Sequence, residues 1–138
     1  MSHALLFKQP TSAVRRGRSG VIALWVVQIA LAGMFLLAGG SKLLGAPAMV
    51  ALFNTIGIGQ WFRYATGLIE VGSALALLVP SIAVVGALTL VPTMIGAVAT
   101  ELFIVGDSAV PPAVLLFGAV GVVCARRHQL LSALPIAR

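Results

Sequence analysis

The sequence has very little charge. Only 9% of its 138 residues are charged and only three are acidic, whereas about a quarter of the residues are charged in an ordinary soluble domain. Hydrophobic residues make up 60% of the chain and its mean hydropathy is +1.11. A water-soluble fold of this length would have no charged surface to present to solvent. The composition therefore predicts an integral membrane protein whose main partner is the lipid bilayer.

Cysteine and histidine are almost as scarce. The one cysteine, Cys124, cannot form an intrachain disulfide or a CxxC pair, and the two histidines, His3 and His128, lie in the flanks. Two histidines so placed cannot hold a haem inside a helical bundle, and they belong to no metal-ligand spacing. A glycine-rich phosphate loop and an acyl-transfer signature are also missing. The sequence thus contains no self-sufficient catalytic motif and no metal site, and it leaves open whether the protein is an enzyme.

Four apolar runs account for most of the chain. A helix of about 20 apolar residues is long enough to cross the hydrocarbon core of a bilayer. The runs therefore predict an all-α integral membrane four-helix bundle formed by residues 20–126, with basic tails at residues 1–19 and 127–138. The predicted spans are residues 21–40, 63–79, 82–105 and 110–125.

The connector at residues 41–62 is apolar but is broken by glycine and proline. Within it, residues 48–56 carry hydrophobic side chains on one face at helical spacing, namely Met49, Leu52, Phe53 and Ile56. We therefore expect a short interfacial helix between the first and second spans. Trp61 and Phe62 are typical of an anchor at the membrane surface.

Basic residues gather in the two flanks. Because cytoplasmic flanks retain Lys and Arg, and because four spans place both termini on one side, both termini are predicted to be cytoplasmic in a multi-pass protein of the bacterial cytoplasmic (inner) membrane. Contact with anionic lipid explains such flanks better than a nucleic-acid site does, and no nucleic-acid partner is expected. The basic residues concerned are Lys8, Arg15, Arg16, Arg18, Arg126, Arg127 and Arg138.

Five charged residues lie between the flanks. The predicted topology places all of them in the outer half of the bundle: Lys42, Arg63, Glu70, Glu101 and Asp107. A charge exposed to lipid costs several kcal/mol, so such residues face the bundle interior and find partners. Lys42 and Arg63 are the cations available to Glu70 and Glu101. We expect Lys42 and Glu70 in particular to form an ion pair.

The same residues predict a binding pocket. Lys42, Arg63, Glu70 and Glu101 should converge at similar depth, with Thr100 beside Glu101 and Trp61 at the rim. The outer half should then contain a small polar cavity, and the inner half should be dry and tightly packed. Two other interpretations stay open: an ion-pair cluster that only fixes helix register, and a subunit contact.

Three short motifs follow one another in a recognisable order: AGGSKLLG ending at Gly45, TIGIG in the connector, and ATGLIEVGSALALLVP in the second span. In this order the sequence resembles the DoxX and DoxX-like membrane proteins over roughly residues 20–126. The family lysine corresponds to Lys42, and its Gly-x-x-Glu segment to Gly67, Glu70 and Gly72.

The resemblance implies a four-helix membrane bundle. Members of the family are linked to thiosulfate:quinone oxidoreductase and to a membrane-associated oxidoreductase complex in mycobacteria. The resemblance therefore implies that the chain is an accessory or quinone-linked subunit of a membrane oxidoreductase system, with quinone as the candidate cofactor. The expected partner is an oxidoreductase or a second copy of the chain.

Two alternative functions remain. A small cation or drug transporter is one, since four spans and an embedded glutamate resemble the small multidrug resistance proteins. In that family the glutamate lies in the first helix, whereas the first span here contains no acidic residue. The other alternative is a structural or assembly factor for other membrane proteins.

The predicted topology is testable with reporter fusions. Alkaline phosphatase fused at Asn54 should be active, because this connector is predicted to face the periplasm, and the same enzyme fused at the C-terminus should be inactive. Activity of the C-terminal fusion would contradict the four-span arrangement.

Overall fold

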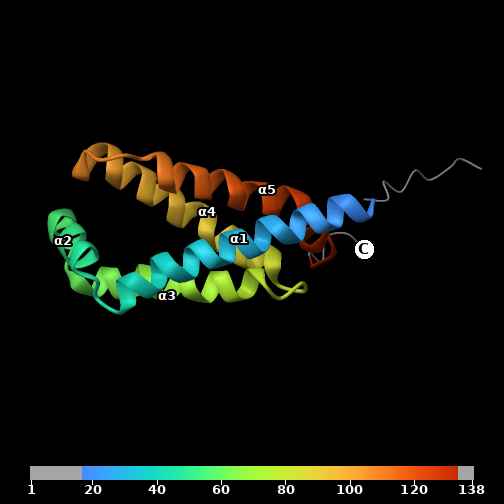
Figure 1. Ribbon diagram of the computed structural model, residues 1–138, viewed down its shortest axis with the longest axis horizontal. Coiled ribbons are helices and arrows are strands. Elements are labelled where there is room, and N and C mark those ends of the chain that lie inside the picture. Colours follow the sequence, from blue (N-terminus) through green and yellow to red (C-terminus); the bar gives the residue numbers. More distant parts are fainter. Residues whose placement is uncertain (1–16, 134–138) are drawn as a thin grey trace, which may run out of the picture.

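The protein is an all-α bundle. The computed structural model describes residues 17–133, which form helices and no strand. The elements are α1 (Arg18–Leu43), α2 (Pro47–Ile56), α3 (Gln60–Leu77), α4 (Ala83–Thr100), the π-helix η1 (Glu101–Val105) and α5 (Val110–Ala133) (Figure 1). The predicted fold class, an all-α membrane bundle with a short helix in the first connector, is confirmed.

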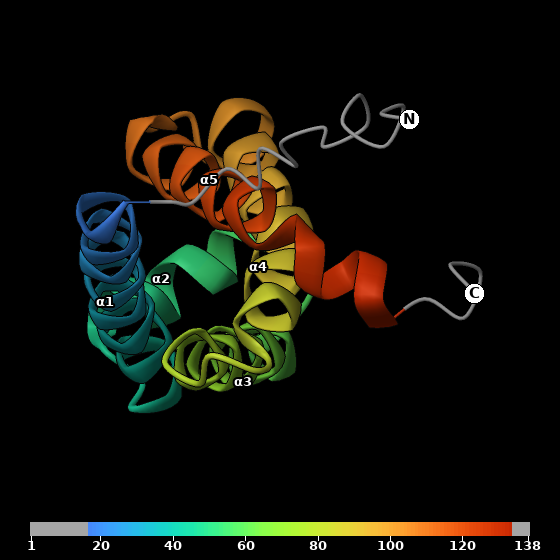
Figure 2. The same cartoon turned by 90° about the vertical axis from the view of Figure 1, so that its right-hand side faces the viewer.

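The four long helices surround a common axis. Seen along that axis they follow one another in the order α1, α3, α4, α5, and α2 lies across one end (Figure 2). We call this the α2 end; it contains the last turn of α1, the first turns of α3 and α5, and η1. The opposite end, which we call the Arg126 end, contains the start of α1, the α3–α4 turn and the last part of α5.

The helices extend further than the apolar runs. The helix α1 begins at Arg18 and ends at Leu43, and α5 continues to Ala133, so part of each predicted tail is helical. The rest of both tails lies outside the described residues. Hydropathy marks where the apolar side chains stop, whereas Arg, Gln and Leu residues continue the backbone hydrogen bonding of a helix without difficulty.

Three helical segments are long and apolar enough to cross a membrane: Arg18–Leu43, Ala83–Val105 and Val110–Ser132. The fourth long helix, α3, contains both Arg63 and Glu70 and is less apolar. Large hydrophobic side chains cover the outside of the bundle, among them Leu37, Phe103 and Phe117. An apolar exterior of this kind suits contact with lipid chains. The chain is an integral membrane protein.

Glycines let the helices approach closely at two contacts. A Cβ atom at Gly39 of α1 would lie 2.9 Å from the backbone oxygen of Gly67 on α3, and one at Gly86 of α4 would lie 2.6 Å from the backbone oxygen of Ser73 on α3. Both distances are too short for a real side chain. Small residues of this kind permit tight helix packing in membranes.

The buried core lies in the middle of the bundle and toward the Arg126 end. It combines large side chains such as Phe35, Leu77 and Leu90 with small ones such as Ala74 and Ala87, all of them inaccessible to solvent. Alternating sizes allow facing helices to interdigitate. The space toward the α2 end is filled differently.

We predict that Gly86→Ala destabilises the bundle by about 1–3 kcal/mol, because the new methyl group would press against backbone atoms of α3. Unfolding in detergent would measure the change. Gly72→Ala is the matched control, since its Cβ would meet no atom within 4 Å and alanine favours a helix by up to about 1 kcal/mol. Equal stability of the two variants would contradict the close contact.

Candidate functional site

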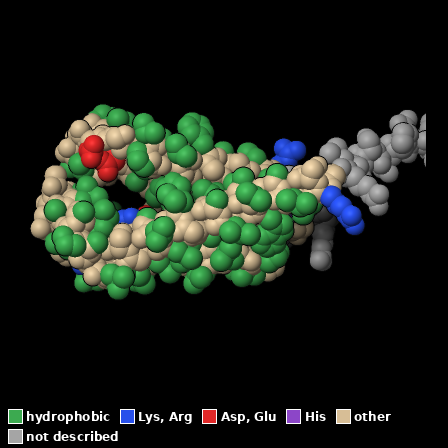
Figure 3. All heavy atoms as spheres, in the orientation of Figure 1, with side chains coloured by type: hydrophobic (Ala, Val, Ile, Leu, Met, Phe, Trp, Pro, Cys, Tyr) green, Lys and Arg blue, Asp and Glu red, His purple; other side chains and the backbone are tan. Residues whose placement is uncertain are grey.

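A cavity of about 660 Å³ lies at the α2 end. All four long helices, α2 and η1 contribute to its wall, which is mostly apolar and includes Phe35, Phe53 and Met94. Its polar side chains are Ser41, Lys42, Thr66, Glu70, Thr89, Thr93, Thr100 and Glu101. Figure 3 shows the molecule hollowed at this end, with a basic side chain visible inside the opening.

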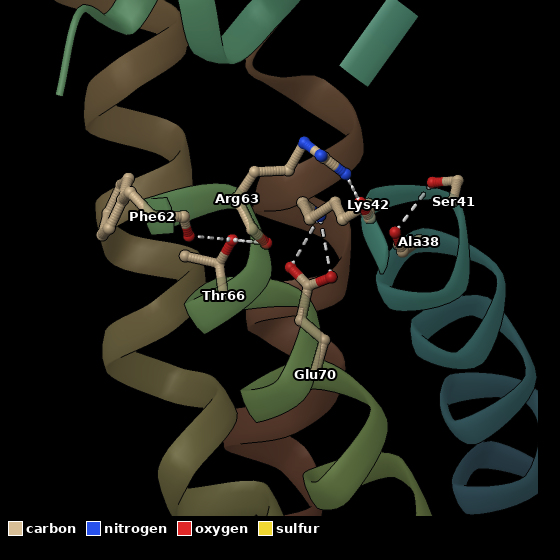
Figure 4. A network of polar contacts seen from close by, with 7 residues as sticks. All are labelled: Ala38, Ser41, Lys42, Phe62, Arg63, Thr66 and Glu70. Atoms are coloured by element: carbon tan, nitrogen blue, oxygen red, sulfur yellow. Dashed lines mark hydrogen bonds and ion pairs between the residues drawn. The ribbon is translucent and has the colours of Figure 1, made fainter. Parts of the chain in front are cut away.

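Lys42 and Glu70 form an ion pair on the cavity wall. The Lys42 ammonium donates hydrogen bonds to both carboxylate oxygens of Glu70, at 2.9 and 2.7 Å (Figure 4). The side chains are 14% and 3% exposed. The predicted pairing is therefore confirmed. It joins the last turn of α1 to the middle of α3, next to the close contact between Gly39 and Gly67.

Arg63 lies outside the cavity, so the expectation that it lines the pocket or pairs with a glutamate is wrong. Its guanidinium donates to the backbone carbonyl of Lys42 and to the side-chain oxygen of Gln60, the latter at 2.6 Å. It also lies 4.2 Å from the ring centre of Tyr64. The Lys42 carbonyl also accepts from the backbone N–H of Gly45, at 3.3 Å, so Arg63 adds a second donor at the end of α1. Its guanidinium thereby lies against Gly45 in the α1–α2 turn.

Thr100 and Glu101 line the cavity where α4 gives way to η1. The backbone N–H of Gly106 donates to the Glu101 carbonyl, at 2.8 Å, and closes the π-helical turn. Such turns are rare and are frequent at functional sites. The Oε2 atom of Glu101 is buried and no described residue forms a hydrogen bond with it. The structure thus brings Glu70 and Glu101 to one cavity, but only Glu70 has an ion-pair partner among the described residues.

Of two other predicted positions, that of Trp61 differs, whereas Asp107 lies in a turn at the α2 end, as its predicted place among the other embedded charges requires. Trp61, expected at the rim, is 64% exposed and is not part of the wall; its ring N–H donates to the carbonyl of Ile58, at 3.0 Å. The neighbouring Phe62 lines the cavity instead. Asp107 lies exposed in the turn before α5, where its carboxylate accepts a hydrogen bond from the backbone N–H of Ser108.

Sequence reasoning missed a polar cluster at the Arg126 end. The fully buried Gln28 donates to the carbonyl of Leu77, at 2.6 Å, and accepts from the guanidinium of Arg126, at 2.8 Å. Arg126 also donates to the carbonyl of Pro80, as does Gln129. The prediction that placed the embedded charges in the outer half therefore overlooked a buried charge at the Arg126 end. Gln28, a polar side chain within the first apolar run, was the available signal, but its partner lies 98 residues further along the chain.

A second, shallow hollow of about 280 Å³ lies on the surface between α1 and α5, lined by apolar and small residues such as Ala23, Leu24 and Gly121. Within residues 17–133, no three His, Cys, Asp or Glu side chains gather in a way that could hold a metal ion. The larger cavity offers apolar walls, one neutralised ion pair and, at Glu101, a carboxyl oxygen that has no hydrogen-bond partner among the described residues.

We predict strong coupling between Lys42 and Glu70. Removing one partner leaves a buried charge alone and typically costs roughly 3–5 kcal/mol, so Glu70→Ala should lower stability in detergent more than Glu70→Ala combined with Lys42→Met. Unfolding of both single variants and the double variant would measure the coupling. Lys42→Met combined with Asp107→Ala is the control cycle and should be additive. Additivity in the Lys42/Glu70 cycle as well would show that the two side chains do not stabilise each other.

Comparison with known proteins gives one result. No curated protein and no solved structure matches the chain, whereas the model of the DoxX-like family matches residues 26–125. This segment contains every residue of the cavity wall, from Phe35 to Leu115, and both partners of the ion pair. The chain belongs to the DoxX-like family.

Proposed function

We propose that this DoxX-like protein is an accessory, quinone-linked subunit of a membrane oxidoreductase system, and that it holds a small amphipathic molecule in the cavity at the α2 end. The observation that carries the proposal is the cavity itself. Its volume of about 660 Å³ falls in the range of small-molecule sites, which combine apolar walls with a few polar groups.

The proposal includes four membrane crossings, with both termini in the cytoplasm of a bacterium. Although α3 contains Arg63 and Glu70, both side chains are buried inside the bundle. The side chains that α3 turns outward are apolar, such as Leu68 and Leu75, which are 63% and 53% exposed. A helix of 18 residues that hides its charges in this way can lie among lipid chains beside the other three.

The cavity can be reached from the side. The helices α1 and α5 are in contact near Leu31 and Gly118 and diverge toward the α2 end (Figure 1). The hollow in Figure 3 opens on this face. If α1 and α5 face lipid, a molecule dissolved in the bilayer can enter the cavity without crossing water. A quinone ring has a suitable size and polarity for such a site.

The polar contacts favour this proposal over the alternatives. The transporter alternative was based on an embedded glutamate that binds the cation, but Glu70 is neutralised by Lys42 and is 2% exposed, so it is not free for that role. A charge pair that only fixed helix register would need no cavity around it. An assembly factor would need a protein-binding surface, and the described residues offer mainly scattered apolar side chains of the lipid-facing type.

The test is affinity purification of the whole chain from its native membrane, with mass spectrometry of the bound lipids and proteins. We expect a quinone and an oxidoreductase to co-purify. Ala97→Phe, which adds a ring to the cavity wall, should reduce the retained quinone about tenfold or more, since overfilling a site costs about 1–3 kcal/mol. Ala99→Phe is the control, because Ala99 is exposed two residues away on the same helix.

Other results would support another function. A stable protein partner without any quinone, unaffected by Ala97→Phe, would favour an assembly factor. Efflux of a cationic dye that depends on Glu70 would favour a transporter. Loss of quinone in both the Ala97→Phe and the Ala99→Phe variants would mean that the cavity is not the site.

A further inference from the structure

The hydroxyl groups on the cavity wall all donate hydrogen bonds to backbone carbonyls of the protein. Thr89, Thr93 and Thr100 each donate to the backbone carbonyl four residues earlier, at 2.8–2.9 Å. Ser41 and Thr66 donate to backbone carbonyls of their own helices in the same way. A hydroxyl that donates to the backbone keeps its oxygen lone pairs but has no proton left for a ligand. These five side chains can therefore only accept hydrogen bonds from a bound molecule.

Other donors are few. The Lys42 ammonium gives two of its three hydrogen bonds to Glu70. The first turn of a helix normally presents free N–H groups, but the first turn of α5 reaches the cavity with Pro111 and Pro112, which have none. The wall thus offers many acceptors and, among the described residues, little more than one ammonium proton as a donor.

Glu101 stands out against this background. Its buried Oε2 has no hydrogen-bond partner among the described residues, and a buried acceptor without a donor costs free energy. The π-helix that begins at this residue gives its turn an uncommon geometry. Both features are what a carboxyl group reserved for a ligand would show.

We infer that the cavity selects molecules whose head group donates a hydrogen bond, and that Glu101 is the residue that accepts it. The inference rests on the proposed function and names the chemical class of its ligand: an apolar body with an O–H or N–H group. A hydroquinone and a protonated primary amine both have this chemistry. The oxidised quinone, which only accepts hydrogen bonds, binds more weakly.

Matched ligand pairs test the inference on the whole chain in nanodiscs, with empty nanodiscs as the blank. The first pair is an alkylated hydroquinone and its dimethyl ether, which share their shape but differ in donors. The hydroquinone should bind about tenfold tighter or more, because the ether leaves a buried acceptor unpaired. The second pair is decylamine and decyltrimethylammonium. If decylamine binds more tightly than the hydroquinone, the natural ligand is an amine; if the hydroquinone binds more tightly, the natural ligand is a hydroquinone.

Variants assign the effect to Glu101. Glu101→Leu should remove the preference for the hydroquinone and leave the affinity for the ether unchanged, whereas Glu101→Gln, which keeps an acceptor oxygen, should retain part of the preference. Asp107→Asn, outside the cavity, should behave like the unchanged protein.

Each failure has its own meaning. Equal binding within both pairs would overturn the inference and leave the proposed function standing. A preference that survives Glu101→Leu would overturn the role of Glu101. No binding of any of the four ligands would contradict the proposed function as well.

Discussion

The ion pair between Lys42 and Glu70 is the constraint on which the rest of the bundle depends. An unpaired carboxylate in an apolar interior costs several kcal/mol, so the contact of Glu70 with Lys42 favours one rotation of α3 against α1. The same rotation brings Gly67 against Gly39 and turns Leu68 outward. One electrostatic requirement thereby determines a helix contact, the placement of α3 in the bundle and one wall of the cavity.

The two ends of the bundle differ in their packing: buried polar contacts join the helices at one end, and a cavity separates them at the other. At the Arg126 end, the Gln28 side chain bonds to both α3 and α5, and Arg126 reaches the α3–α4 turn through the carbonyl of Pro80. These contacts join α1, α3 and α5 to one another and to the α3–α4 turn. At the α2 end, the short helix α2 packs against α3, η1 and α1 and lies across the end of the bundle (Figure 2). The cavity is the space that this arrangement leaves open.

Most polar side chains on the cavity wall find their partners in their own helix or in the neighbouring one. The threonines of α4 return their protons to their own helix, so they stand in an apolar wall without needing partners from other helices. Glu70 takes its partner from α1. Glu101 differs from all of these, since its buried oxygen has no partner among the described residues. That contrast between satisfied and unsatisfied groups distinguishes a binding group from the structural ones on the same wall.

Composition and periodicity by themselves determined the membrane class, the helical segments and the short helix in the first connector, because a bilayer requires long apolar helices and tolerates few charges. The ion pair followed as well, since an embedded acid needs a base at similar depth. The tertiary structure alone decided which partner each basic side chain takes. Arg63 is drawn to the end of α1, and Gln28 meets Arg126 across 98 residues. Such pairings depend on how helices rotate and tilt against one another, and a linear hydropathy pattern contains no information about those angles.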